Sequence, residues 1–156
     1  MSVEAVKEYF EKLGFPGRVL EFDISSATVE LAAQALKVNP ERIAKTISLK
    51  DETGCLLVVT AGDARIDNIK FKAEFGMKAS MLPSDDVIRL VGHAVGGVCP
   101  FAIPANIKVY MDVSMKRFES IFPACGSGNS AIELTCDQLF EFGKAQKWVD
   151  VCKGWE

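Results

Sequence analysis

Hydrophobic and polar residues alternate most regularly over residues 43–50, IAKTISLK, which predicts a central β-strand. Its odd-numbered residues, from Ile43 to Leu49, should share one face, and its even-numbered residues should take the other. A turn over residues 51–54 and an aliphatic strand over residues 55–62 complete a predicted hairpin. Three further strands are predicted over residues 18–22, 107–113 and 130–135.

Apolar residues at helical spacing predict helices between these strands. The expected helices are one from Ser2 with the stripe Val3, Val6, Phe10 and Leu13, ending at Gly14 and Pro16; one over Val29–Leu36 after a cap at Ser25–Ser26; a single turn opened by Asn39–Pro40; one over 67–76; one over 84–90; and one from Thr135, with a capping box to Gln138.

Helices and strands are interspersed, but no strand–helix–strand rhythm persists, so a doubly wound parallel sheet is not expected. The pattern instead predicts a mixed α/β domain with flanking helices around a curved, largely antiparallel sheet or barrel. The 156 residues fit a single domain, 1–156, that is long enough to bury a core.

Composition narrows the class of protein. No apolar run approaches the length of a membrane span, and the acidic N-terminal segment does not resemble a secretion signal. The five cysteines are odd in number and lack CxxC spacing, which favours reduced, buried thiols in a cytoplasmic protein. We therefore expect no membrane partner and a cytoplasmic location.

Charge is unevenly distributed along the chain, whose net charge is −3. Residues 37–117 carry twelve basic and nine acidic side chains, whereas the two flanks together carry six basic and twelve acidic ones. A modest basic zone of this kind can meet a few phosphates but does not support a many-phosphate grip on nucleic acid. A solvated surface of mixed charge explains the same counts.

Several common chemistries are excluded. His93 is the only histidine, so no metal site can be built from several imidazoles, and neither a GxSxG nor a P-loop motif is present. The segment Gly126–Ala131 matches a loose dinucleotide-binding pattern, but a predicted strand follows it where a helix should begin. We expect no metal and no cofactor.

Lys45 stands out in the central strand because it occurs in register with the apolar residues Ile43 and Ile47. Burying an ammonium group without a partner is costly, so such a lysine usually has a specific role. The alternative is a lysine at the rim of the sheet whose charged end reaches water.

A second unusual segment runs from Gly92 to Phe101, with adjacent glycines followed by Val-Cys-Pro. Glycines allow a backbone to approach a ligand closely, and free N–H groups there can hold an oxyanion. An ordinary turn is the alternative interpretation.

These features occur together with others in an order that resembles one family. The matching segments are Thr28–Ala33, Lys45–Thr46, Gly62–Asp63 with Asp67, the GxxxP loop Gly96–Pro100, and Gly126–Leu134. Over nearly the whole chain they are similar to the YbaK/ProX/EbsC family of aminoacyl-tRNA deacylases, which also occurs as the editing insertion of prolyl-tRNA synthetases. The resemblance implies a barrel-like mixed sheet and metal-independent hydrolysis of the ester on the acceptor end of a mischarged tRNA, with prolyl-tRNA synthetase as a possible partner.

The resemblance also implies the site. Lys45 would position the substrate, and backbone amides of Gly96, Gly97, Val98 or Cys99 would hold the reacting carbonyl, since Pro100 has no N–H. The substrate's own ribose hydroxyl or thiol would assist the attack. The other substrate-binding positions would be Thr28, Thr46, Pro100, Phe101, Gly126, Ser127, Gly128 and Asn129.

The amino acid that is removed stays open, because the resemblance implies that Cys99, Cys125 and Ala131 tune the pocket. Alanine, serine, cysteine and 2-aminobutyrate all fit. Two other functions stay open as well: a non-catalytic module that binds tRNA ends or a synthetase, and a thiol enzyme that uses Cys99 beside His93. The oligomeric state is not indicated.

Overall fold

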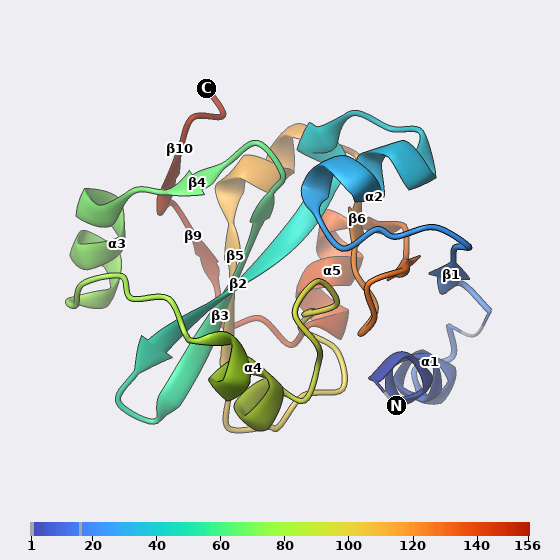
Figure 1. Ribbon diagram of the computed structural model, residues 1–156. Coiled ribbons are helices and arrows are strands. Elements are labelled where there is room, and N and C mark those ends of the chain that lie inside the picture. Colours follow the sequence, from blue (N-terminus) through green and yellow to red (C-terminus); the bar gives the residue numbers. More distant parts are fainter. Residues whose placement is uncertain (1, 16) are drawn as a thin grey trace.

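A computed structural model of the protein describes residues 2–15 and 17–156. Its α-helices are α1 (Ser2–Lys12), α2 (Val29–Leu36), α3 (Asn68–Phe75), α4 (Ser84–Val91) and α5 (Cys136–Phe142), and its 3-10 helices are η1 (Pro40–Arg42) and η2 (Val113–Arg117). They surround a curled sheet (Figure 1). No described helix has the length and apolar character needed to cross a membrane.

The main sheet has six strands in the order β8-β6-β2-β3-β5-β9. These are β8 (Leu134–Thr135), β6 (Ser120–Pro123), β2 (Ile43–Asp51), β3 (Gly54–Ala61), β5 (Lys108–Asp112) and β9 (Trp148–Val149). Two small antiparallel pairs lie outside it, β1 (Leu20–Glu21) with β7 (Ser130–Ala131), and β4 (Arg65–Ile66) with β10 (Cys152–Lys153).

The predicted hairpin forms the centre of this sheet. Strands β2 and β3 pair antiparallel from Ala44 with Ala61 to Asp51 with Gly54, the longest pairing in the molecule. Parallel pairings then extend the sheet on both sides, from β2 to β6, from β3 to β5 and from β5 to β9. The predicted mixed α/β class is therefore confirmed, and parallel neighbours accompany the antiparallel centre.

Most predicted elements form where the pattern placed them, with two corrections. The expected strand over 130–135 is split into β7 and β8, which pair with different strands, β1 and β6. The cap of α2 is Thr28, whose hydroxyl accepts from the Leu31 N–H at 3.2 Å, and not Ser25–Ser26. Strands β4, β6, β9 and β10 were not predicted. Except for β6, each is only two residues long and shows no alternation.

The core lies on both faces of the central strands. Every residue of β3 from Cys55 to Ala61 is buried, because β3 has a strand on each side and packed side chains on each face. An aromatic cluster of Phe10, Phe15, Phe101 and Phe142 packs α1 against the α5 end of the molecule. This arrangement leaves one end of β2 free to form a cavity.

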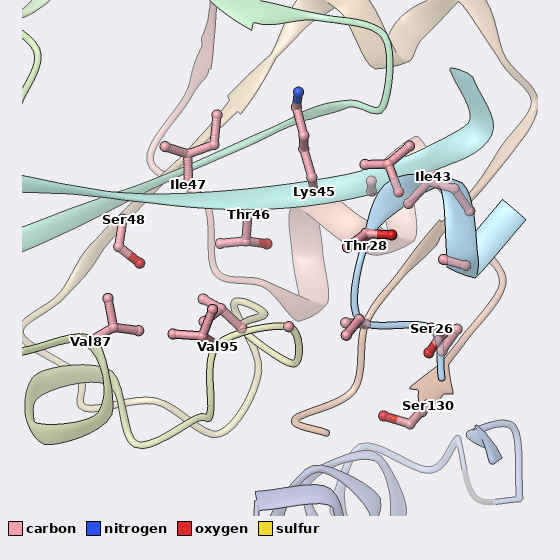
Figure 2. Close-up of a pocket in the computed structure, with 18 of the residues that line it drawn as sticks. Ser26, Thr28, Ile43, Lys45, Thr46, Ile47, Ser48, Val87, Val95 and Ser130 are labelled. Carbon is pink, nitrogen blue, oxygen red and sulfur yellow. The ribbon is translucent and has the colours of Figure 1, made fainter. Parts of the chain in front are cut away.

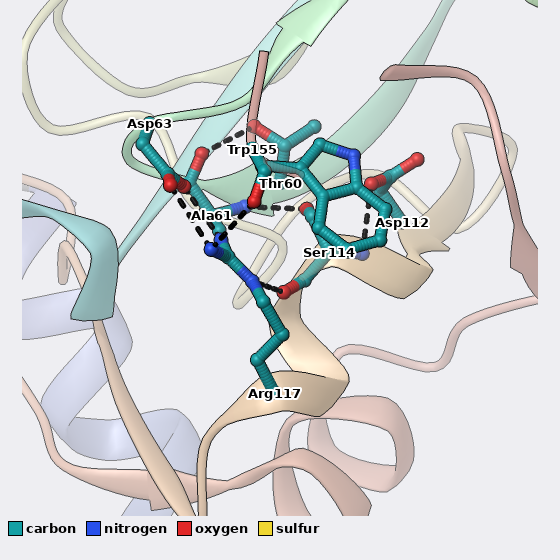
Figure 3. A network of polar contacts seen from close by, with 7 residues as sticks. All are labelled: Thr60, Ala61, Asp63, Asp112, Ser114, Arg117 and Trp155. Atoms are coloured by element: carbon teal, nitrogen blue, oxygen red, sulfur yellow. Dashed lines mark hydrogen bonds and ion pairs between the residues drawn. The ribbon is translucent and has the colours of Figure 1, made fainter. Parts of the chain in front are cut away.

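A buried polar network holds the C-terminal segment against the sheet (Figure 3). Asp112, which has no exposed surface, accepts hydrogen bonds from the N–H groups of Ser114 at 3.0 Å and Val151 at 2.9 Å. The Ser114 hydroxyl in turn accepts from the Ala61 N–H at 3.1 Å. The Asp112 carboxylate thus joins β5 to the segment leading to β10, and the Ser114 hydroxyl joins η2 to β3.

Arg117 fastens the same region from outside. Its guanidinium donates to both carboxylate oxygens of Asp63, at 3.0 and 2.6 Å, and to the Trp155 carbonyl at 3.1 Å. Its Nε donates to the Ser114 carbonyl at 2.8 Å. The C-terminal residues therefore cover the sheet face on which Thr60 and Asp112 lie.

We predict that Asp112→Ala lowers the free energy of unfolding by about 3 kcal/mol, because two buried N–H groups lose their acceptor. Urea denaturation followed by circular dichroism measures the change. Asp150→Ala is the matched control, since the Asp150 carboxylate is largely exposed and pairs only with Lys70; it should change stability by less than about 0.5 kcal/mol. Equal losses for the two variants would contradict the proposed role of the Asp112 network.

Candidate active site

A cavity of about 400 Å³ opens beside β2 (Figure 2). Its walls come from β2, the start of α2, the 81–87 segment with the start of α4, the 95–98 loop and the 122–131 segment. Met81 and Val95 lie at its rim and are 65% and 59% exposed, whereas Leu82, Val87 and Phe122 are buried. The walls are mostly aliphatic, so polar groups inside it are few and identifiable.

Side chains of β2 alternate as predicted, and residues 43–48, from both faces of the strand, line the cavity. Figure 2 shows Thr46 and Ser48 directed toward Val87 and Val95, whereas Lys45 extends from the opposite side of the strand. Lys45 borders the cavity without entering its floor. Lys45 therefore borders the cavity from the face of β2 opposite to the side chains of Thr46 and Ser48.

Lys45 is half-buried and makes no hydrogen bond or ion pair with the residues that the structure describes. It pairs across the hairpin with Thr60, on the face covered by the C-terminal segment. Burial lowers the pKa of its ammonium, while the charges of Asp63 and Glu30 oppose that effect. The ammonium group thus lies at the edge of the cavity without a direct partner among the described residues.

The GxxxP loop contributes Gly96 and Val98 to the cavity wall, but not Gly97, and Val95 precedes the loop on the same wall. The Gly97 N–H donates to the Ala94 carbonyl at 2.9 Å, so it is not a free oxyanion donor as the sequence suggested. The N–H groups of Gly96 and Val98 donate to no other group in the described part of the chain. The candidate amide donors are therefore reduced to these two.

Gly97 is required for a different reason from the predicted one. A Cβ at this position would lie 2.4 Å from the Ser127 nitrogen and 2.6 Å from the Gly126 carbonyl carbon. The Gly126 N–H also donates to the Gly97 carbonyl at 2.9 Å. The backbone that approaches Gly97 is therefore the neighbouring 126–128 loop and not a ligand.

Gly126, Ser127, Gly128 and Asn129 support the cavity from behind and do not line it. The Gly128 carbonyl accepts from the Ser26 N–H at 2.7 Å; the Asn129 carbonyl accepts from the Phe22 N–H at 2.8 Å, and the Asn129 side-chain Nδ2 donates to the Phe22 carbonyl at 3.0 Å. Gly96 packs on the 25–28 segment, since a Cβ at Gly96 would lie 2.9 Å from the Ala27 Cβ. Three chain segments, 25–28, 96–97 and 126–128, thus meet in one glycine-rich junction.

Cys99, Pro100 and Phe101 are buried and lie outside the cavity. Cys99 and His93 do touch, with 3.5 Å between Sγ and Nε2, but Nε2 lies 2.8 Å from the Phe101 carbonyl and is best assigned as the donor to it. A protonated Nε2 cannot accept the thiol proton. Burial also raises the pKa of Cys99 to about 12 and lowers that of His93, so this pair does not form a thiolate–imidazolium pair.

The structure adds hydroxyl groups that the sequence did not single out. The side-chain oxygens of Ser26, Thr46 and Ser48 are buried in the cavity wall and have no hydrogen-bond partner in the described part of the chain. Of the positions expected to tune the pocket, Ala131 lines it, whereas Cys99 and Cys125 do not. Ser48 lies two residues after Thr46, so strand alternation alone places both side chains on one face. The sequence does not show that this face meets the cavity.

Acid–base groups are scarce around the cavity. Its described lining contains no Asp, Glu, His or Cys, and Lys45 is its one ionisable side chain. Nowhere among residues 2–15 and 17–156 do three His, Cys, Asp or Glu side chains gather as they would around a metal ion. Chemistry at this site must come from positioned donors, from the Lys45 charge and from the substrate itself.

Comparisons with known proteins agree with this geometry. Residues 25–142 match the model of the aminoacyl-tRNA editing domain. The chain is 50% identical over 157 residues to the uncharacterized protein YwhH of Bacillus subtilis (strain 168), with 100% of both covered. It is 30% identical over 120 residues to the proline–tRNA ligase of Lysinibacillus sphaericus (strain C3-41), covering 76% of this chain but only 20% of the ligase.

A solved structure of a candidate trans-editing enzyme for prolyl tRNA synthetase superposes with a TM-score of 0.88 at 27% identity, covering 98% of each chain. The two proteins therefore share the fold over their whole length.

We predict that Gly97→Ala destabilises the protein by about 1–3 kcal/mol, because its methyl group must displace the Gly126–Ser127 backbone. Gly128→Ala is the control in the same junction, since its Cβ would meet only the Ala27 Cβ at 3.4 Å. Thermal unfolding of both variants tests the difference. A Gly97→Ala protein as stable as the control would show that the two loops are not tightly packed.

Cys99 should resist alkylation in the folded protein, because its thiol is fully buried and its pKa is raised to about 12. Treatment with iodoacetamide at pH 8, followed by peptide mass spectrometry, should label the partly buried Cys136 before Cys99. In denaturant both should react alike. Faster labelling of Cys99 in the native state would revive the thiol-enzyme hypothesis.

Proposed function

Because the chain belongs to the aminoacyl-tRNA editing domain family, we propose that it hydrolyses the ester linking a wrongly attached amino acid to tRNA. The observation that carries the proposal is the cavity. All of its lining residues, from Ser26 to Ala131, fall within the segment that matches the family model. Its volume suits an aminoacyl group together with part of the terminal ribose.

In the proposed reaction, water adds to the ester carbonyl carbon, and the bond from that carbon to the ribose oxygen breaks. The proton lost by the water passes to the leaving ribose oxygen, with a neighbouring ribose hydroxyl of the substrate as the relay. This route suits a cavity without a carboxylate, imidazole or thiol in its described walls. It needs neither a metal nor a cofactor.

The N–H groups of Gly96 and Val98 are the proposed donors to the oxyanion that forms on the carbonyl. Both residues line the cavity, and neither N–H is donated elsewhere in the described chain. Donors held in place by the rigid glycine junction lower the barrier because they need not reorganise during the reaction. Thr28, at the cavity mouth, is fixed by its capping bond to the Leu31 N–H.

Lys45 is proposed to act on the anionic parts of the tRNA acceptor end. Its ammonium has no protein counter-ion and borders the cavity from the other face of β2. A phosphate placed against it would fix the ester over the Thr46 side of the strand. Lys45 would thus serve as an electrostatic anchor, not as a proton donor.

The proposed substrate is a mischarged tRNA of the proline type, edited in trans to prolyl-tRNA synthetase. The proline–tRNA ligase match and the trans-editing enzyme structure support this partner. The lining residues from β2, the 81–87 segment and the 95–98 loop fall within residues 37–117, the part of the sequence with an excess of basic side chains.

A non-catalytic module that binds tRNA ends is the second candidate. The lack of acid–base residues in the described cavity lining is the observation that favours it. It assigns Lys45 to phosphate binding alone and requires no free amide donors. Kinetics of the Lys45 variant separate the two functions.

We predict that Lys45→Ala lowers the single-turnover rate of deacylation at least about 100-fold, because the ester is no longer fixed against the donors. Lys50→Ala is the matched control, since Lys50 is an exposed residue of the same strand. It should retain the wild-type rate. The assay uses tRNA(Pro) charged with a non-cognate amino acid and saturating protein.

Stability should move in the opposite direction. Because folding lowers the pKa of Lys45, its charge costs stability at neutral pH, so Lys45→Ala should unfold at the same or a higher temperature. That gain should disappear as the pH rises toward 10.5, where the unfolded lysine also loses its proton.

If Lys45→Ala cleaves bound tRNA at the wild-type rate, and both lysine variants weaken binding equally in a salt-dependent way, the binding module is the correct function.

A further inference from the structure

The floor of the cavity carries polar groups that the proposed mechanism does not use. Thr46 Oγ1 and Ser48 Oγ are buried and lack hydrogen-bond partners among the residues that the structure describes. The two side chains lie on one face of β2, the face on the side of Val87 and Val95 (Figure 2). Buried hydroxyl groups are normally satisfied, so two orphans side by side in a cavity indicate a ligand group that completes them.

The surrounding wall limits what that ligand group can be. Leu82 and Val87 are 8% and 5% exposed, and Ser48 is 6% exposed, so buried residues line this end of the cavity. The described lining contains no carboxylate to hold the substrate's ammonium group. A small neutral side chain with its own hydroxyl fits both the space and the chemistry.

The third orphan hydroxyl belongs to a separate part of the cavity. Figure 2 shows Ser26 beside Ser130, at the far end from Ser48 and Val87. One small side chain cannot reach both ends. The Thr46–Ser48 pair is therefore the part that an amino-acid side chain can meet, while Ser26 remains for the ribose end of the substrate.

Resting on the proposed function, we propose that Thr46 and Ser48 select serine as the amino acid that is removed. The serine hydroxyl hydrogen-bonds to one of these two oxygens, donating to it or accepting from it. Alanine leaves both protein hydroxyls unpaired in an apolar wall, and a site built to bind a hydroxyl discriminates strongly against the analogue that lacks it. Cysteine offers only a weak donor and acceptor at the same position.

The test uses the full chain and one tRNA(Pro) transcript charged separately with serine, alanine or cysteine. Wild-type kcat/KM should be at least about tenfold higher for serine than for alanine, with cysteine between them. Ser48→Ala should lower the serine value at least about tenfold and leave the alanine value within about threefold. Thr46→Val, which keeps the side-chain shape, should likewise lower the serine value and leave the alanine value nearly unchanged.

Ser80→Ala is the control, since Ser80 is an exposed serine two residues before Leu82 and does not line the cavity. All variants should unfold at or above the wild-type temperature, because each loses at most a hydroxyl without a partner. Equal wild-type rates for serine and alanine, a cysteine rate above serine, or a Ser48→Ala loss that is the same for both substrates would overturn the selection for serine alone. No hydrolysis of any of the three esters would overturn the proposed function with it.

Discussion

Strand β2 lies between two packed layers, and the strict alternation of its side chains governs what the molecule can do. One face carries Lys45 toward Thr60 and the region covered by the C-terminal segment, while the other carries Thr46 and Ser48 toward the cavity. A cation and a set of neutral hydroxyl groups are thereby separated by the thickness of one strand. The ammonium stays at the edge of the site, where solvent and anionic ligands reach it, and the cavity floor stays uncharged.

The glycine junction gives this site its second rigid wall. Gly97 packs against the backbone of Gly126 and Ser127, and Gly96 packs on Ala27, so three distant segments approach more closely than side chains would permit. The N–H of Gly97 donates to the Ala94 carbonyl within the turn. The N–H groups of Gly96 and Val98 therefore remain as the candidate donors to a ligand in the described chain. Preorganised amides of this kind are effective because their orientation is fixed during folding, not during the reaction.

A cavity lined by one ionisable side chain is an unusual place for hydrolysis. The described lining supplies shape, hydroxyl groups and amide donors, but no group that takes a proton at neutral pH. Such a site suits a substrate that brings its own hydroxyl next to the scissile bond, as the terminal ribose of an aminoacyl-tRNA does. Its selectivity must then arise from contacts with the amino acid, which is why the unpaired oxygens of Thr46 and Ser48 bear on function.

Local pattern determined much of this protein. The alternation in residues 43–50, the hairpin, the Thr135 capping box and the ends of α3 and α4 follow from nearest-neighbour chemistry, and they form as predicted. The family resemblance followed from the order of short motifs. Lys45 was identified because a charge among apolar residues is visible in the sequence alone.

Tertiary structure decided what covers each face of β2, because alternation separates two faces without saying what packs on either. It also decided that Gly97 contacts another loop, that Cys99 and Phe101 are core residues, and that residues 130–135 divide between two partners. Each depends on contacts between segments tens of residues apart. Such contacts are set by the packing of the whole chain, and they cannot be predicted from the local sequence around Ser48 or Gly97.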